Sequence, residues 1–70
     1  MTIEQLKKLT NRDIIQDEKG SVYVIERNSG SMLEFVELTT GTWKMCSYKW
    51  LTEYKHIGRL SNELAFGYSF

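Results

Sequence analysis

The side chains that could perform nucleophilic or acid–base chemistry are few in this chain of 70 residues, which has one cysteine, Cys46, and one histidine, His56. A nucleophilic site brings together a thiol or hydroxyl, a base and a group that orients the base. A Cys46–His56 pair is geometrically possible if both residues lie in strands of a small barrel. The simpler interpretation is a packed cysteine and a surface histidine, because buried free cysteines are common.

Metal and nucleotide sites find equally little support in the sequence. One cysteine and one histidine cannot complete a tetrahedral zinc site without carboxylates or a second chain. The neighbouring carboxylates of Asp17 and Glu18 lie in an expected tight turn, a position that Asp favours. The sequence contains no glycine-rich phosphate-binding loop of the Gly-x-Gly-x-x-Gly or Walker type. We therefore expect a protein that is not an enzyme and holds no metal and no cofactor.

Aromatic residues are concentrated in the second half of the chain. Among them are Trp43, Tyr48, Trp50, Tyr54, Tyr68 and Phe70. Tryptophan and tyrosine join a large apolar surface to a polar tip, which favours half-buried positions at the edge of a groove, and aromatic-lined grooves bind extended peptides. We predict a partner-binding surface made of Trp43, Tyr48, Trp50 and Tyr54. In the alternative, at least one of the two tryptophans fills the core.

Basic residues are interleaved with these aromatic residues. Residues 43–59 carry four bases and one acid, whereas residues 13–37 carry six acids and two bases. The four bases are Lys44, Lys49, Lys55 and Arg59. Bases beside aromatic faces also bind single-stranded nucleic acid, so these residues form an alternative nucleic-acid-binding surface; a merely solvated face is the other interpretation. Because the formal net charge is zero, such binding would be weak and steeply salt-dependent.

The composition fits one small globular domain. Hydrophobic residues make up 41% of the chain and charged residues 26%, which is too apolar for a disordered segment. This length leaves room for a single core. One cysteine cannot form an internal disulfide, so we expect a reducing, cytoplasmic setting. No apolar run is long enough to span a bilayer, which predicts no membrane association.

The first residues favour a short amphipathic helix. Thr2 and Gln5 fit a capping box at the start of a stretch with apolar residues at helical spacing. This predicts a helix within residues 1–10, from about Thr2 to Leu9. Such a helix is too short to persist alone in water, so it must dock on the rest of the domain.

The middle of the chain predicts a β-meander. Gly20, Gly30 and Gly41 recur ten and eleven residues apart, which is the spacing of hairpin turns. The segments between these glycines are rich in β-branched and aromatic residues, which are typical of strands. The predicted strands are residues 13–16, 22–26, 32–38 and 42–47.

The strands differ in how clearly they indicate a buried face. Residues 22–25 are apolar on both faces, which suits a central strand covered on both sides. Residues 32–38 also carry apolar side chains on both faces, so the pattern does not choose the buried one; a β-bulge or a strong twist could reconcile them. Residues 47–54 predict one or two helical turns. Residues 55–60 predict a short closing strand that is irregular at Gly58.

A four-stranded meander, a helical turn and a fifth short strand follow one another in an SH3-like barrel. The segments that carry this resemblance are Asp13-Ile14-Ile15, Asp17-Glu18-Lys19-Gly20-Ser21-Val22-Tyr23-Val24, Leu38-Thr39-Thr40-Gly41 and Leu51-Thr52-Glu53-Tyr54-Lys55-His56-Ile57-Gly58. Over residues 13–60 the chain resembles the small uncharacterised SH3-like barrel proteins of phages and prophages. The resemblance implies a mainly β fold, a small five-stranded SH3-like barrel with a short N-terminal helix, and no shared catalytic motif.

These features predict a non-enzymatic protein-binding module of a single domain, residues 1–70, in which residues 61–70 form an apolar tail after the barrel. We expect it to dock on a host or viral protein, and a phage setting implies use as an inhibitor of a host factor. The alternative is a small nucleic-acid-binding barrel. Apolar residues of the tail, among them Leu64 and Phe66, could cover their own core or extend a neighbour's sheet, so a monomer and a homodimer are both compatible with the sequence.

Overall fold

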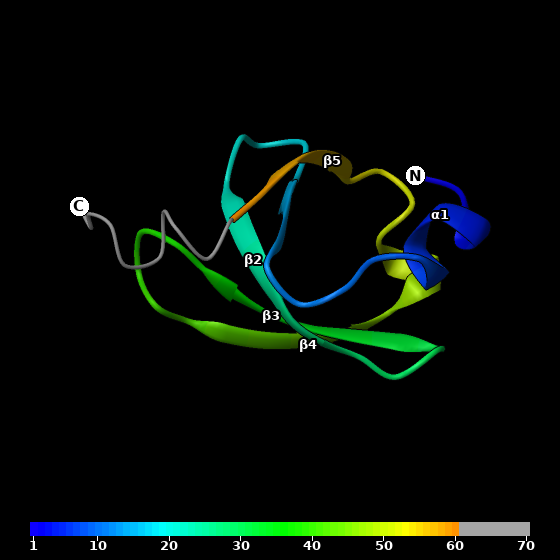
Figure 1. The fold of residues 1–70 in the computed structure, drawn as a ribbon. Coiled ribbons are helices and arrows are strands. Elements are labelled where there is room, and N and C mark those ends of the chain that lie inside the picture. Colours follow the sequence, from blue (N-terminus) through cyan, green and yellow to red (C-terminus); the bar gives the residue numbers. More distant parts are fainter. Residues whose placement is uncertain (61–70) are drawn as a thin grey trace.

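The computed structural model describes residues 1–60 as a curved antiparallel sheet of five strands with one short helix and one 3-10 turn (Figure 1). The elements are α1 (Ile3–Lys7), β1 (Asp13–Gln16), β2 (Val22–Asn28), β3 (Met32–Glu37), β4 (Trp43–Ser47), η1 (Tyr48–Trp50) and β5 (Lys55–Arg59). The predicted order and type of elements are confirmed. The predicted tail, residues 61–70, lies outside the described residues.

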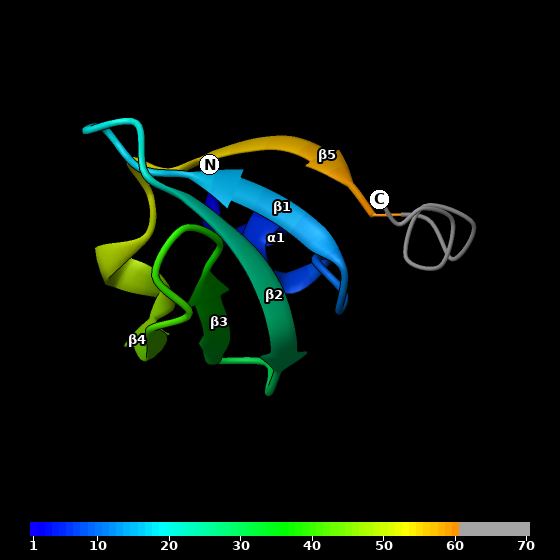
Figure 2. The same ribbon diagram turned by 90° about the vertical axis from the view of Figure 1, so that its left-hand side faces the viewer.

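The sheet has the strand order β4-β3-β2-β1-β5, so β4 and β5 are its two edges. A closed barrel requires its two end strands to pair. In this sheet β4 pairs with β3 alone and β5 with β1 alone. The sheet curves strongly (Figure 2) but is not closed into a barrel, which corrects that part of the prediction.

Helix α1 begins with the predicted capping box. The Gln5 amide donates to Thr2 Oγ1 at 3.1 Å, and the Thr2 amide donates to Gln5 Oε1 at 2.8 Å. At the other end of the helix, Asn28 Nδ2 of β2 donates to the carbonyls of Leu6 and Leu9, at 2.9 and 2.8 Å. The Leu6 carbonyl also accepts from the Leu9 amide at 3.2 Å. Because carbonyls at the C-terminal end of a helix lack a full set of intrahelical partners, the Asn28 side chain adds to their hydrogen bonding and fixes α1 on the sheet.

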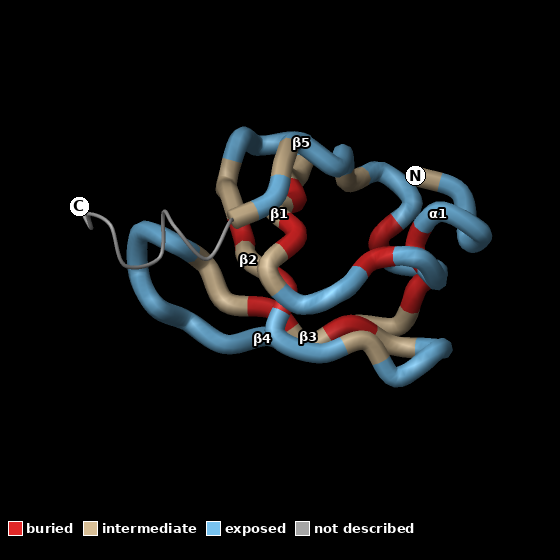
Figure 3. Tube along the Cα trace, in the orientation of Figure 1, coloured by how far each residue is buried: buried red, intermediate tan, exposed pale blue. Residues whose placement is uncertain are grey.

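The core lies inside the curve of the sheet, beneath α1 and η1, which sit together at one end (Figure 1). Its buried apolar residues are Leu6, Leu9, Ile15, Tyr23, Ile25, Leu33, Phe35, Tyr48 and Leu51. The rings of Tyr23 and Phe35 meet edge to face, with centroids 5.0 Å apart, a favourable arrangement of aromatic quadrupoles. The red segments of Figure 3 mark this inner face.

The structure resolves which face of β3 is buried. Leu33 and Phe35 are completely buried, whereas Met32 and Val36 are half-buried on the opposite face. The pairing of β2 with β3 shifts register between Ile25 and Arg27. A bulge of this kind adds one residue and re-aims the strand beyond it, so the irregularity considered for this part of the sheet lies in β2.

Strand β2 differs from the expectation of a strand covered on both sides. Tyr23 and Ile25 are buried on the inner face, but Val22 and Val24 are only half-buried on the outer face. Helix α1 and η1 both pack on the inner face. Within residues 1–60 no helix or strand covers the outer face of the sheet, although the apolar side chains of Val22 and Val24 lie on it.

The first hairpin turn is built around Asp17, as its sequence predicts. One carboxylate oxygen accepts from the amides of Lys19 and Ser21, at 3.0 and 2.9 Å, and the other accepts from the Tyr23 hydroxyl at 3.0 Å. Burial acts to raise the pKa of this carboxyl, but these hydrogen bonds outweigh it and hold the pKa below its ordinary value. The following Gly20 has a φ of 95°, a conformation that glycine adopts readily.

None of the helices in the described part of the chain is long and apolar enough to cross a membrane.

Truncating a side chain should lower the free energy of unfolding more on the inner face of the sheet than on the outer face. Ile25→Val removes one methylene from the core and should lower the free energy of unfolding by about 1 kcal/mol. Trp43→Ala, on the outer face, should change it by less than about 0.5 kcal/mol. Urea denaturation followed by circular dichroism measures both. The reverse order of effects would contradict the assignment of the inner face as the core.

Candidate functional site

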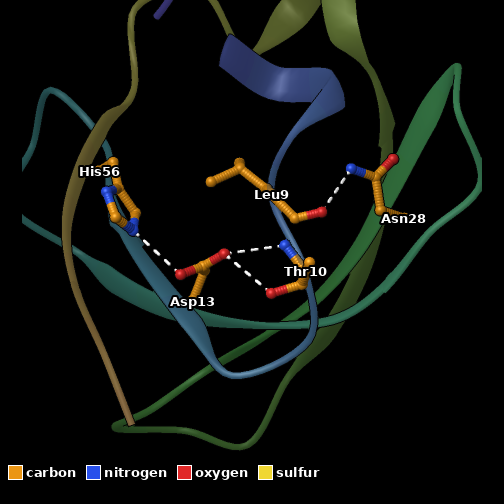
Figure 4. A network of polar contacts seen from close by, with 5 residues as sticks. All are labelled: Leu9, Thr10, Asp13, Asn28 and His56. Carbon is orange, nitrogen blue, oxygen red and sulfur yellow. Dashed lines mark hydrogen bonds and ion pairs between the residues drawn. The ribbon is translucent and has the colours of Figure 1, made fainter.

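A buried carboxylate and the histidine of the chain meet beside a small pocket (Figure 4). Asp13, at the start of β1, is only 6% exposed. Its Oδ2 accepts from the amide and hydroxyl of Thr10, at 2.8 and 3.2 Å, and its Oδ1 lies 3.1 Å from His56 Nε2. The pocket has a volume of about 260 Å³ and is lined by Met1, Gln5, Lys8, Leu9, Asp13 and His56.

Hydrogen bonds decide the charge state of Asp13. Burial acts to raise the pKa of its carboxyl, yet the bonds from the Thr10 amide, from His56 and from the Thr10 hydroxyl together lower that pKa below its ordinary value. Asp13 is therefore ionised at neutral pH with both oxygens occupied. The carboxylate ties the segment between α1 and β1 to the edge strand β5.

The structure does not assemble the sequence-suggested pair of Cys46 and His56. Cys46 lies in β4 and packs against the core, whereas His56 lies in β5 at the opposite edge of the sheet. His56 points instead to Asp13, and the residues that line its pocket include no serine or cysteine. Among residues 1–60 no cluster of three or more histidine, cysteine, aspartate or glutamate side chains could hold a metal ion.

The four predicted partner-binding aromatic residues divide between core and surface. Tyr48 is 4% exposed, and its hydroxyl donates to Asn28 Oδ1. Tyr54 is half-buried with its ring against those of Tyr23 and Phe35, and burial is the main cause that raises its pKa to about 12. Trp43 and Trp50 are 54% and 70% exposed. The predicted surface is therefore available through its two tryptophans, while the two tyrosines pack inside.

The four predicted nucleic-acid-binding bases are distributed over both edges of the sheet. Lys44 and Lys49 belong to β4 and η1, whereas Lys55 and Arg59 belong to β5, and three strands lie between β4 and β5 in the sheet order. Lys49 Nζ lies 5.4 Å from the ring centroid of Trp50. A base and an exposed tryptophan are thus adjacent at one place, but strand order separates the four bases into two pairs.

Lys44 is oriented by the core beside it. It is opposite the buried Phe35 in the pairing of β3 with β4, so its side chain leaves β4 on the inner face. Its Nζ donates to the Tyr23 hydroxyl at 3.4 Å and lies 5.2 Å from the centroid of that ring. The hydrogen bond is the main cause that raises the pKa of Lys44 above its ordinary value, which keeps a positive charge at this edge.

An apolar row crosses the uncovered outer face of the sheet. The registers place Trp43 opposite Val36, Val36 opposite Val24, and Val24 opposite Ile14, and directly opposite residues point to the same face. The three aliphatic residues are half-buried by one another, and Trp43 ends the row at the edge. Leu38 and Met45, both 49% exposed, flank this row. Apolar residues so placed are typical of interaction surfaces.

The hydrogen-bond register of β4 determines which of its backbone groups are free. The Glu37 amide donates to the Thr42 carbonyl at 2.9 Å, and the Tyr48 amide donates to the Ser31 carbonyl at 3.2 Å. Hydrogen-bonded pairs alternate along an antiparallel ladder. Lys44 and Cys46 therefore direct their backbone groups to β3, whereas Trp43, Met45 and Ser47 direct theirs to the open edge.

The two edges of the sheet differ in how they resist further pairing. Strand β5 carries Lys55, His56 and Arg59 and is bulged where it meets β1. Charges and bulges are the features that commonly block strand addition at an edge. Strand β4 is regularly paired and presents Trp43 and Met45; in Figure 3 its first half is pale blue. The open edge of β4 is the stronger candidate site.

Sequence reasoning identified Trp43 but missed Met45 and the outer-face valines. The alternation of Trp43 and Met45 in the sequence was a signal for a shared face, yet it did not show that this face would be uncovered. Comparison with protein-family models, curated proteins and solved structures finds no match to the chain. The candidate site is thus defined by its geometry.

Amide hydrogen exchange should show the alternation along β4. We expect the amides of Lys44 and Cys46 to exchange at least about tenfold more slowly than those of Trp43 and Met45, because only the former pair face a strand. Exchange followed by NMR on the full chain measures the rates residue by residue. Equal protection along the strand would contradict a free edge.

Stability should depend on the charge of Asp13 in acid. Its folded-state pKa lies below the ordinary value of 3.8, so its stabilisation is complete above that value and is lost as the pH falls through the folded-state pKa. Asp13→Asn should lower the free energy of unfolding at neutral pH by about 1 to 2 kcal/mol. It should also flatten the fall of stability below about pH 4. Urea denaturation of the wild type and of Asp13→Asn from neutral pH into acid measures both effects. If the free energies of unfolding of the two proteins change in parallel with pH, the role assigned to the Asp13 carboxylate is contradicted.

Proposed function

We propose that this chain is a small non-enzymatic protein-binding module that uses the open edge and outer face at β4. The observation that carries this proposal is the exposure of Trp43 on an edge strand, at the end of an apolar row that no element of residues 1–60 covers. Tryptophan is enriched among the few residues that provide most of the binding energy of protein interfaces. Trp50, 70% exposed in η1 after the end of β4, is a second exposed tryptophan.

We propose that the partner is a host or viral protein and that the module acts in the cytoplasm as an inhibitor of a host factor. The support is the resemblance of residues 13–60 to SH3-like barrel proteins of phages and prophages, together with a strand order that suits an opened barrel of that kind. The proposed mechanism is steric blocking, in which the module covers a surface of its partner and needs no reacting group.

The nucleic-acid alternative receives less support from the arrangement of charge. A groove for single-stranded nucleic acid follows a continuous basic path with stacking aromatic residues. Lys49 beside Trp50 offers one such step, but Lys55 and Arg59 lie on the other edge strand. The protein-binding proposal uses side chains that the sheet places side by side.

Tryptophan truncation tests the proposed surface. The full chain, immobilised, is exposed to nuclease-treated host lysate, and captured proteins are quantified by mass spectrometry for the wild type, Trp43→Ala, Trp50→Ala and Ile57→Ala. Ile57 is a matched control because it is 49% exposed on the opposite edge strand. We expect Trp43→Ala to cost about 2 kcal/mol of binding, roughly a thirtyfold rise in Kd, and Ile57→Ala to have little effect.

Other results would overturn this proposal. If the Trp43→Ala and Ile57→Ala variants capture the same proteins in the same amounts as the wild type, β4 is not the interface. Capture that disappears with nuclease treatment would favour the nucleic-acid alternative instead.

A further inference from the structure

The free backbone of β4 is ready to accept another strand. Trp43, Met45 and Ser47 direct their amides and carbonyls away from β3. No backbone hydrogen bond joins these groups to a turn or loop in the described part of the chain. An extended segment of another protein could therefore form main-chain hydrogen bonds along this edge, which is the basis of recognition by strand addition.

The side chains of β4 specify what an added strand must carry. On the outer face, Trp43 and Met45 are about half exposed and border the apolar row. On the inner face, Lys44 lies between them in sequence and extends over Tyr23. Directly opposite residues of paired strands share a face, so three successive residues of an added strand meet Trp43, Lys44 and Met45 in turn: one apolar, one positive and one apolar side chain.

The charge carried by β4 and η1 themselves is positive. Between residues 38 and 52 the chain contains Lys44 and Lys49 and no aspartate or glutamate. Within residues 1–60 neither lysine forms an ion pair. Glu37 of β3 lies on the same face as Lys44 and attracts its charge without forming an ion pair, while Glu34, opposite Met45 on the outer face, is paired with Arg27 at 3.7 Å. Opposite charges on facing strands stabilise their pairing, and like charges oppose it.

We propose that the partner binds as an extended strand added to β4, with apolar residues beside Trp43 and Met45 alternating with an acidic residue opposite Lys44. This inference rests on the proposed function and names the kind of partner that the surface fits. It also disfavours a second copy of this chain as the occupant. Antiparallel pairing of two β4 strands about Met45 would bring the two copies of Lys44 to diagonal positions on one face, where their charges repel.

Synthetic peptides test the inference directly. The probe is a ten-residue peptide of alternating valine and glutamate with blocked ends, titrated into the full 15N-labelled chain. One control peptide replaces glutamate by lysine. Two further control peptides are N-methylated at alternate residues: one has lost the backbone N–H donors on one edge of the extended peptide, and the other has lost those on the opposite edge. We expect the valine–glutamate peptide to shift the amide resonances of residues 43–47. The lysine peptide should bind at least about tenfold more weakly. The N-methylated peptide that has lost the donors facing β4 should be weakened to a similar extent.

Proline substitution tests the same contact from the protein side. Met45→Pro removes an amide that faces the open edge and leaves the ladder to β3 intact, a position that proline tolerates. It should weaken peptide binding at least about tenfold, because a donor is lost and the ring obstructs the added strand. Met45→Ala keeps the amide and should weaken binding by only about threefold. The NMR spectrum shows whether each variant is folded, and the N-methylated peptides provide the same test if Met45→Pro is not.

The outcomes separate this inference from the proposed function. Absence of binding by the valine–glutamate peptide, shifts away from β4, or equal binding of all N-methylated forms would overturn strand addition. Concentration-dependent dimers that Met45→Pro abolishes, without peptide binding, would assign the edge to a second copy and also overturn it. If Trp43→Ala still reduces partner capture in these cases, the protein-binding proposal survives; if it does not, both proposals fail.

Discussion

One-sided burial is the constraint on which the structure depends. A chain of this length has apolar side chains enough for a single core, and α1, η1 and the buried residues of all the inner strands compete for the same side of the sheet. Once Leu33 and Phe35 are inside, Val36 and Trp43 must be outside, because neighbouring residues of a strand point to opposite faces. The apolar outer face is thus a direct consequence of how the small core is filled.

A few polar side chains fasten the segments that lie outside the ladders. Asn28 satisfies the carbonyls at the end of α1 and accepts from Tyr48, so it joins β2, the helix and η1. Asp13 joins the α1–β1 connection to β5 through Thr10 and His56. In the described part of the chain no buried side-chain nitrogen or oxygen lacks a partner, as a stable core requires. The hydrogen-bonding capacity of these residues is used in holding the fold.

The open sheet has a functional consequence that a closed barrel would not have. Closure removes free edges altogether, whereas within residues 1–60 this sheet has two edges, and only β5 is bulged and carries several basic residues, while β4 carries Lys44 alone. At β4 free main-chain groups, two exposed apolar side chains and unpaired positive charge coincide. The proposed binding surface and the incompletely closed sheet are therefore two aspects of the same arrangement.

The sequence by itself determined the local structure: the capping box of α1, the glycine-marked turns, the Asp17 turn, the order of strands along the chain and the 3-10 turn before β5. These depend on neighbouring residues, whose preferences act through nearby hydrogen bonds and backbone sterics. Tertiary structure alone decided which face of β3 is buried and that His56 meets Asp13 rather than Cys46. It also decided that Tyr48 and Tyr54 pack in or against the core while Trp43 and Trp50 do not, and that the outer edge of β4 is free within residues 1–60. Each of these depends on contacts between residues distant in sequence, and a period of two cannot show which of two apolar faces a single small core will accept.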